Sequence, residues 1–217
     1  MFFSSSSSTS LPKIKTTSVQ TLGEGKWLSL ELLSYIDTNG ITRPWERCIR
    51  KTTSTTEKAD AVDIIAHLKT KTGSQLLLVV QYRPALEKYT IEFPSGLIDE
   101  NETPIDAAQR ELLEETGYKV DKNRIQLSEQ PVCYEPGLTN STCYVAQLEL
   151  DITTLDHPPK PQLEDDEWSL NVLLLPIEQL ITHLKELENK HGLVIDSRVY
   201  SFACGLAFSR NNKMEWN

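Results

Sequence analysis

Apolar residues along the chain gather in short runs that are typical of β-strands. The runs are rich in aliphatic and β-branched side chains and are bounded by turn-forming residues, a pattern that favours half-buried or fully buried strands. It predicts strands over residues 61–68, 74–83, 89–96, 141–150 and 167–175. No internal repeat accompanies these runs.

Other segments have apolar residues at helical spacing. In residues 176–192 they recur every three or four positions, and the final glycine stands where a helix C-cap belongs. Elsewhere Thr103 can cap a helix, Pro104 suits its first turn and Gly117 can end it in a left-handed conformation. These signals predict a helix over residues 104–116. A further helix is expected near the end of the chain, and the whole pattern predicts an α+β fold.

The N-terminal part differs from the rest of the chain. Residues 1–22 are rich in serine and threonine and lack acidic side chains, a composition that cannot form a core and predicts a disordered tail. Residues 23–57 contain two strand-like runs around the turn signal at 37–40, where Asn-Gly supplies the positive φ angles of a tight hairpin, and they end in a polar linker. We therefore predict a small β domain over 23–57 and a main domain over 58–217.

The composition indicates a globular protein and limits its partners. Of 217 residues, 39% are hydrophobic, which is enough to bury a core. The 22 basic and 31 acidic side chains give a net charge of −9, without a run rich in lysine or arginine. This argues against nucleic acid or an anionic membrane as a partner, because both attract basic patches. The longest apolar runs, such as residues 76–80, fall far short of the roughly 20 residues that span a bilayer, so we expect a soluble protein.

The four cysteines bear on the compartment. They include no CxxC pair, which favours core thiols in a reducing environment over disulfides or a metal site. A cytoplasmic location is therefore expected, and a nuclear one stays open. The serine-rich, acid-poor start of the chain also has features of a mitochondrial transit peptide, but its lack of arginine disfavours that alternative.

The segment "GLIDENETPIDAAQRELLEETG", residues 96–117, carries five glutamates and two aspartates. On the helix predicted there, Glu111 and Glu115 border the apolar stripe, where like charges repel and lose hydration. A solvated acidic face is the simplest interpretation of an acidic helix, but it fits these positions poorly. A bound hard cation removes both penalties, so the pattern favours Mg²⁺, with Mn²⁺ as an alternative.

Gly96, Glu102 and the run from Arg110 to Tyr118 together resemble the Nudix box, G-x5-E-x7-R-E-U-x-E-E-x-G-U, in which U is usually aliphatic. Every charged and glycine position is filled, and Tyr118 is the one mild departure. The resemblance implies a Nudix α/β/α sandwich around a mixed sheet, a loop-helix-loop that holds divalent metal, and hydrolysis of a nucleoside diphosphate linked to another group X. Glu102 and Arg110 are expected to shape the loop through an ion pair.

Segments outside the box resemble the eukaryotic-type ADP-ribose (ADP-sugar) pyrophosphatases over about residues 23–205. They include "YTIEFPSGLID" and "PVCYEPGLTNST", in which Pro136 matches a proline typical of that class. The resemblance implies a homodimer that exchanges the small β domain, and hydrolysis of ADP-ribose to AMP and ribose 5-phosphate. Two alternatives stay open: another substrate, such as a different ADP-sugar, a dinucleoside polyphosphate or an oxidised nucleotide, and a sensor that binds ADP-ribose without turnover.

The resemblance also implies roles for individual carboxylates. Glu111 and Glu115, with the Ser95 backbone carbonyl, match the metal-binding positions. Glu114 matches a further catalytic or metal-linked carboxylate. Glu167 matches the general base that activates the attacking water, although the three acids before it leave the register open and a solvated loop acid stays an alternative.

The substrate-binding positions follow from the same match. Trp27 and Trp45 match a pair that covers the two faces of the adenine, one from each subunit, with core tryptophans as the alternative. An acid can read the adenine edge, and arginine forks suit the diphosphate oxygens. The expected contacts with the nucleotide come from Trp27, Trp45, Glu46, Arg50, Arg83, Gly96 and Leu97.

Overall fold

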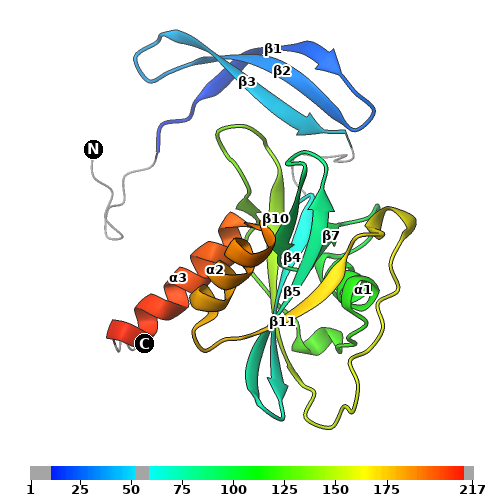
Figure 1. Ribbon diagram of the computed structural model, residues 1–217. Helices are drawn as coiled ribbons and strands as arrows, with labels where there is room; N and C mark the ends of the chain where they lie inside the picture. The colour runs from blue at the N-terminus through cyan, green and yellow to red at the C-terminus, as the bar shows by residue number, and fades with distance from the viewer. Residues whose placement is uncertain (1–10, 52–58, 213–217) are drawn as a thin grey trace. The chain divides into compact units, whose positions relative to one another are not determined.

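The computed structural model describes residues 11–51 and 59–212 (Figure 1). It divides the chain into two compact units. Unit 1 comprises Met1–Lys58 and Cys133–Ser141, and unit 2 comprises Ala59–Val132 and Thr142–Asn217.

Unit 1 is built on a three-stranded antiparallel sheet. Its strands are β1 (Lys15–Glu24), β2 (Leu28–Ile36) and β3 (Thr42–Arg50), which lie in that order. The predicted hairpin joins β2 to β3, but its turn is longer than a tight two-residue turn. The Asp37 carboxylate accepts hydrogen bonds from the amides of Asn39 and Ile41, and Gly40 has a positive φ of 77°. Asn39 does not share this left-handed conformation.

The structure differs from two predicted domain boundaries. β1 begins at Lys15, inside the segment predicted to be disordered as far as residue 22. Its polar sequence carries no strand signal, because every residue of β1 is exposed and the strand depends on its pairing with β2. Cys133–Ser141, assigned by sequence to the main domain, groups with unit 1, where the Leu138 carbonyl accepts the Cys48 amide at 2.8 Å. The remaining predicted tail, 1–10, and most of the linker lie outside the described residues.

Unit 2 is built on a mixed sheet. The strands of this sheet are β4 (Ala61–Thr70), β5 (Gly73–Arg83), β6 (Lys88–Glu92), β7 (Ser95–Leu97), β8 (Gln126–Leu127), β9 (Val132–Cys133), β10 (Thr142–Asp151), β11 (Asn171–Pro176) and β12 (Val194–Ile195). The second residue of β9, Cys133, already counts with unit 1. The main path runs β12-β6-β5-β4-β10-β8. β4 pairs with β10 in parallel, whereas β5 pairs with β4, β6 and β11 antiparallel. Each predicted strand is present, with two differences. The one over 89–96 is divided at Phe93 and Pro94 into β6 and β7, and the one over 167–175 begins only at Asn171, after the 3-10 turn that ends at Glu167.

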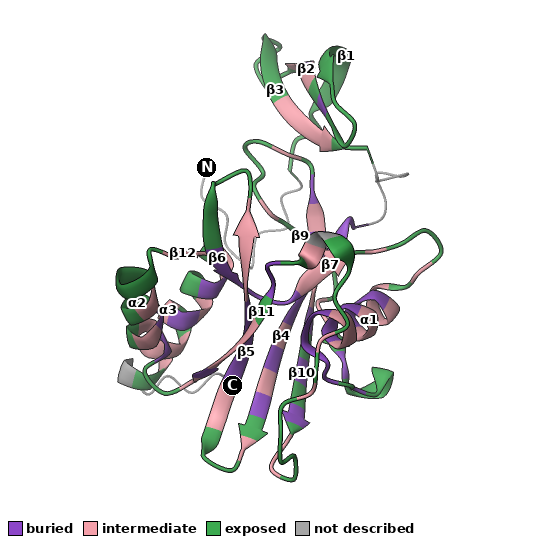
Figure 2. Ribbon diagram, turned by 45° about the vertical axis from the view of Figure 1, so that its right-hand side comes forward, coloured by how far each residue is buried: buried purple, intermediate pink, exposed green. Residues whose placement is uncertain are grey.

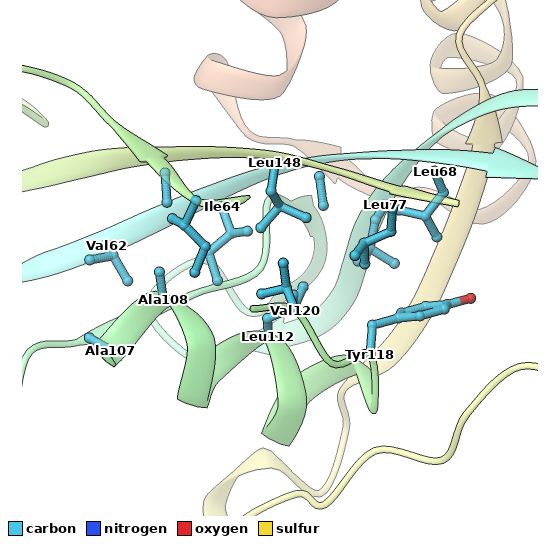
Figure 3. Packing of buried hydrophobic residues seen from close by; sticks show 14 residues of the cluster. Val62, Ile64, Leu68, Leu77, Ala107, Ala108, Leu112, Tyr118, Val120 and Leu148 are labelled. Atoms are coloured by element: carbon cyan, nitrogen blue, oxygen red, sulfur yellow. The ribbon is translucent and has the colours of Figure 1, made fainter. Parts of the chain in front are cut away.

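Helices cover both faces of this sheet (Figures 1 and 2). They are α1 (Pro104–Thr116), α2 (Leu180–His191) and α3 (Ser197–Asn212), with 3-10 turns at Lys122–Arg124 and Asp165–Glu167. On one face Ala108 and Leu112 of α1 pack against Ile64 and Leu148 of the sheet (Figure 3). On the other, side chains of α2 and α3 pack against β5 and β6 in a second core. The predicted α/β/α sandwich is therefore confirmed.

Helix α1 has the bounds that its sequence predicts. The Thr103 hydroxyl accepts the Asp106 amide at 3.2 Å, and Pro104 occupies the first turn. At the other end Gly117 has a φ of 77°, and its amide donates to the Leu113 carbonyl at 2.8 Å. Local signals at both ends thus fix the helix that carries the acidic cluster.

The cysteines and helices qualify two further expectations. All four cysteines are free, but Cys143 alone among them is buried and Cys133 is exposed, so the prediction of four core thiols is wrong. In residues 11–51 and 59–212, none of the helices combines the length and the apolar surface needed to cross a membrane.

Candidate active site

The backbone of strand β7 lies directly against Glu111 and Glu115 of α1. The Ser95 amide donates to Glu115 Oε2 at 2.9 Å. At Gly96 a Cβ atom would lie only 1.8 Å from Glu111 Oε1, so any larger residue would displace that carboxylate. Glycine at this position therefore lets the strand and the helix approach each other. The predicted metal-binding carbonyl belongs to the same residue, Ser95, whose amide holds Glu115.

Arg110 clamps the loop between β7 and α1. Its guanidinium makes a two-bond ion pair with Glu102, at 2.9 and 2.8 Å, so the predicted ion pair is present. It also donates to the Leu97 carbonyl at 2.9 Å and to Glu111 and Glu114 at 2.7 and 3.1 Å. Leu97 thus contributes its carbonyl to the loop, while its side chain is exposed.

Three carboxylates converge beside this clamp. Glu111 and Glu115 lie on α1, and Glu167 ends the 3-10 turn before β11; each offers an oxygen within 4.8 Å of the others. Glu111 is 8% exposed and Glu115 only 2%. Glu167 comes from the run of four consecutive acids at 164–167, in which the sequence left the register open. Glu114, predicted as a further catalytic carboxylate, pairs with Arg110 and does not belong to it.

The electrostatics of the cluster favour a bound cation. Burial raises the pKa of Glu111 to about 7, although Arg110 partly opposes the shift. Burial raises the pKa of Glu115 to about 9, against the hydrogen bond from Ser95. Glu167 adds like charge to both. Buried oxygen ligands that repel one another are the donor set that a hard divalent cation prefers, so the residues present fit such a metal.

Arg83 lies near the cluster and is held by a buried acid. Its guanidinium makes two bonds to Glu92, at 2.8 and 2.6 Å, and Glu92 is only 4% exposed. The Arg83 side chain itself is 43% exposed, so part of the fork can still contact a ligand. The sequence gives no signal for this pair, because Glu92 lies in the run "YTIEF", whose other residues read as an ordinary buried strand.

The remaining predicted contacts lie in unit 1. Trp27 is 61% exposed and Trp45 is 48% exposed, so the alternative that they are core tryptophans is wrong for this chain. Glu46 and Arg50 are exposed on β3, opposite Leu32 and Leu28 of β2. The structure therefore divides the predicted site, with the carboxylates in unit 2 and the expected base contacts in unit 1.

A helix-covered mixed sheet with buried carboxylates on the helix after a glycine-bearing strand defines a metal-dependent hydrolase of the Nudix type. The family model of the NUDIX domain matches residues 57–197. The chain belongs to the Nudix family.

Two curated relatives match the chain over nearly its full length. It is 36% identical over 201 residues to the mouse protein named ADP-sugar pyrophosphatase, covering 92% of this chain and 90% of the relative. It is 32% identical over 200 residues to the Saccharomyces cerevisiae protein named ADP-ribose pyrophosphatase, covering 91% of this chain and 84% of the relative. A crystal structure of an ADP compounds hydrolase matches with a TM-score of 0.64 at 21% identity, covering 95% of this chain and all of that one, and supports the fold alone.

Proposed function

We propose that the protein hydrolyses the diphosphate of ADP-ribose, and of related ADP-sugars, to AMP and the sugar phosphate. For ADP-ribose the second product is ribose 5-phosphate. The observation that carries the proposal is the cluster of Glu111, Glu115 and Glu167 in the Nudix fold. The names of the mouse and yeast relatives support the ADP-sugar part. The proposed location is the cytoplasm.

The chain's own groups account for the chemistry. Glu111 and Glu115 would hold Mg²⁺, with Mn²⁺ as a substitute, and Ser95 N–H fixes the Glu115 carboxylate. When bound, the cation polarises a phosphoryl oxygen and neutralises the carboxylates. Glu167 would accept the proton of the attacking water, and the exposed part of the Arg83 fork would contact the diphosphate. One phosphorus–oxygen bond breaks, and the water oxygen joins that phosphorus.

Base recognition is proposed to use both tryptophans and two chains. Trp45 lies opposite Leu33 in the β2–β3 register, whereas Trp27 precedes Leu28. About six residues therefore separate them along the sheet, or roughly 20 Å at the rise of a strand. A stacked base lies within about 7 Å of each ring. The separation supports a sandwich in which a homodimer supplies one tryptophan from each subunit, with Glu46 near the base and Arg50 near the diphosphate.

The sensor alternative predicts binding without turnover. It is disfavoured because the chain retains every carboxylate of the box, with Glu111 and Glu115 buried and Arg110 already paired to Glu102. A different diphosphate substrate would use the same carboxylate cluster. The sensor is therefore tested by comparing binding with turnover, and the substrate by comparing compounds.

The deciding experiment follows AMP release from ADP-ribose by the full chain, with Mg²⁺ and then with EDTA. ADP-glucose and a diadenosine polyphosphate are run beside it. We expect fast AMP release from ADP-ribose that requires the metal. Tight ADP-ribose binding without AMP would instead establish a sensor, and faster cleavage of another compound would move the substrate assignment.

Base stacking is tested with Trp45→Ala, and Ile41→Ala serves as a matched control because Ile41 is an exposed apolar residue of the same unit. Losing a stacked ring should raise KM about tenfold and change kcat less. Sedimentation should show a dimer. An active monomer, or an unchanged KM in folded Trp45→Ala, would contradict the two-chain sandwich.

A further inference from the structure

The segment 158–170 passes α1 and enters β11, and it carries Glu167 (Figure 1). Side chains in the first half of this segment do not pack tightly against the rest of unit 2. A cavity of about 660 Å³ lies against it, lined by Pro158, Pro159 and Leu163 on the segment and by Tyr118 and Val172 among the residues opposite. The stretch before Glu164 therefore lines an open pocket, and specific bonds on either side of Glu167 contribute to its position.

The first bond joins the segment to the end of α1. The Gln162 amide donates to the Glu114 carbonyl at 2.7 Å. Glu114 is in the last turn of the helix, where carbonyls lack partners within the helix. The contact is close, since a Cβ atom on Gly117 would lie 2.5 Å from the Lys160 carbonyl oxygen. The C-terminus of the metal-site helix thus holds the start of the segment.

The second bond joins the segment to β5. The hydroxyl of Ser169, which is 8% exposed, accepts the Tyr82 amide at 3.0 Å. The first pair of the β5–β11 ladder is Asn171 with Val80. Ser169 would continue that ladder, but its carbonyl accepts the Asn171 side-chain amide at 2.8 Å instead. The Ser169 hydroxyl therefore accepts the Tyr82 amide where a β11 carbonyl would otherwise do so, and the regular ladder begins only after this residue.

Between the two bonds a single turn orients the acid. In the turn Asp165–Glu167 the Glu167 carboxylate accepts the Glu164 amide at 2.8 Å, in a reciprocal capping arrangement. The turn cannot shift along the cluster while Gln162 and Ser169 stay bonded on either side of it.

We propose that the Gln162 amide and the Ser169 hydroxyl are positioning groups that hold the Glu167 carboxylate against Glu111 and Glu115. They act through Glu167 and not on the substrate. The inference rests on the proposed function, in which Glu111 and Glu115 hold a divalent metal, and it adds that the Glu167 carboxylate also contributes to binding that metal.

The test is a double-mutant cycle on Mn²⁺ affinity, measured by titration calorimetry without substrate. Ser169→Ala should weaken Mn²⁺ binding about tenfold, the effect typical of groups that orient a ligand. In the Glu167→Gln background the same substitution should have no further effect. Ser128→Ala is the matched control, because the Ser128 hydroxyl also accepts a backbone amide, that of Val145 at 3.2 Å, and it should leave affinity unchanged.

A second pair of variants tests the other bond. Gln162→Pro removes the amide hydrogen, whereas Gln162→Ala keeps it and removes only an exposed side chain. Gln162→Pro should weaken Mn²⁺ binding and lower kcat with little change in KM, and Gln162→Ala should match the wild type. This pair also decides the matter if Ser169→Ala does not fold.

Equal losses of Mn²⁺ affinity with and without Glu167, or wild-type affinity in folded Ser169→Ala and Gln162→Pro, would overturn the proposal. The proposed function fails separately, if the wild type releases no AMP from ADP-ribose. The Mn²⁺ cycle does not depend on turnover, so the two failures can be told apart.

Discussion

Helices α1 and α2 follow the same local pattern and differ in their surroundings. Both are amphipathic, and both end at a glycine in the left-handed conformation, Gly117 with φ 77° and Gly192 with φ 65°. In each, the glycine amide donates to a carbonyl four residues back at 2.8 Å. Yet a Cβ on Gly117 would meet the Lys160 backbone at 2.5 Å, whereas nothing lies within 4 Å of one on Gly192.

The acidic side chains differ in the same way. On α2, Glu186 and Glu188 are exposed, as expected of a solvated helix face. On α1, Glu111 and Glu115 are buried and converge with Glu167. Capping residues and apolar spacing therefore define a helix, while a buried carboxylate or a crowded glycine marks the helix that serves a site.

The largest expected effect separates the carboxylates of the two helices. Glu115→Gln should lower kcat for ADP-ribose roughly a hundred- to thousandfold, because a charged contact to the metal contributes several kcal/mol. Glu188→Gln, on the exposed face of α2, should leave kcat unchanged. Steady-state kinetics with Mg²⁺ check both, and circular dichroism confirms that each variant is folded. A folded Glu115→Gln protein with near wild-type kcat would remove the distinction between the helices.

A smaller effect separates the two glycines. Alanine in the left-handed conformation costs about 1 kcal/mol, and this is all that Gly192→Ala should lose in free energy of unfolding. Gly117→Ala should lose a further 1–3 kcal/mol or so, because its Cβ must displace backbone and not a flexible side chain. Urea unfolding of both variants measures the difference. Equal losses of unfolding free energy in the two variants would mean that the Lys160 backbone can move aside at no cost, and that the C-terminus of α1 is packed no more tightly than that of α2.

Elements that are determined by neighbouring residues can be predicted from the sequence, and elements that depend on distant partners cannot. The bounds of α1 are predictable because Thr103, Pro104 and Gly117 act within one turn of the helix ends. The exposed strand β1 is not, because among the described residues it pairs with β2 alone, and its polar Ser/Thr residues give no sequence signal for such pairing. Burial of Glu111 and Glu115 is predictable from their place beside the apolar stripe.

The parts of the site that depend on the path of a loop could not be predicted from the residues alone. That Glu167 reaches the cluster depends on where the chain enters β11. The hydrogen bonds of Ser169 and Gln162 set that point, and neither residue belongs to a motif. Glu92, which binds Arg83, likewise belongs to no motif that would predict this role. The roles of Trp27, Trp45, Glu46 and Arg50 stay predictions.

The last expected effect is on stability as a function of pH, and it distinguishes acids on α1 itself. Burial raises the folded-state pKa of Glu111 to about 7 and of Glu115 to about 9. Between the ordinary value near 4.5 and these values the folded state holds protons that the unfolded state has lost. The free energy of unfolding of metal-free protein should therefore fall as pH rises from about 5 to 9.

Mg²⁺ binds the ionised carboxylates, so the rise in Tm that it causes should be larger at pH 8 than at pH 6. Asp106, on the same helix, acts in another window: Lys122 and Thr103 lower its pKa to about 2, so its contribution is lost only as pH falls below about 4. The double variant Glu111→Gln/Glu115→Gln should flatten the slope between pH 6 and 9 and abolish the Mg²⁺ effect, while leaving the acid limb in place. Differential scanning calorimetry with and without Mg²⁺ measures all three. A slope that persists in the double variant would show that other groups titrate there, and that the buried carboxylates of α1 are not what separates it from α2.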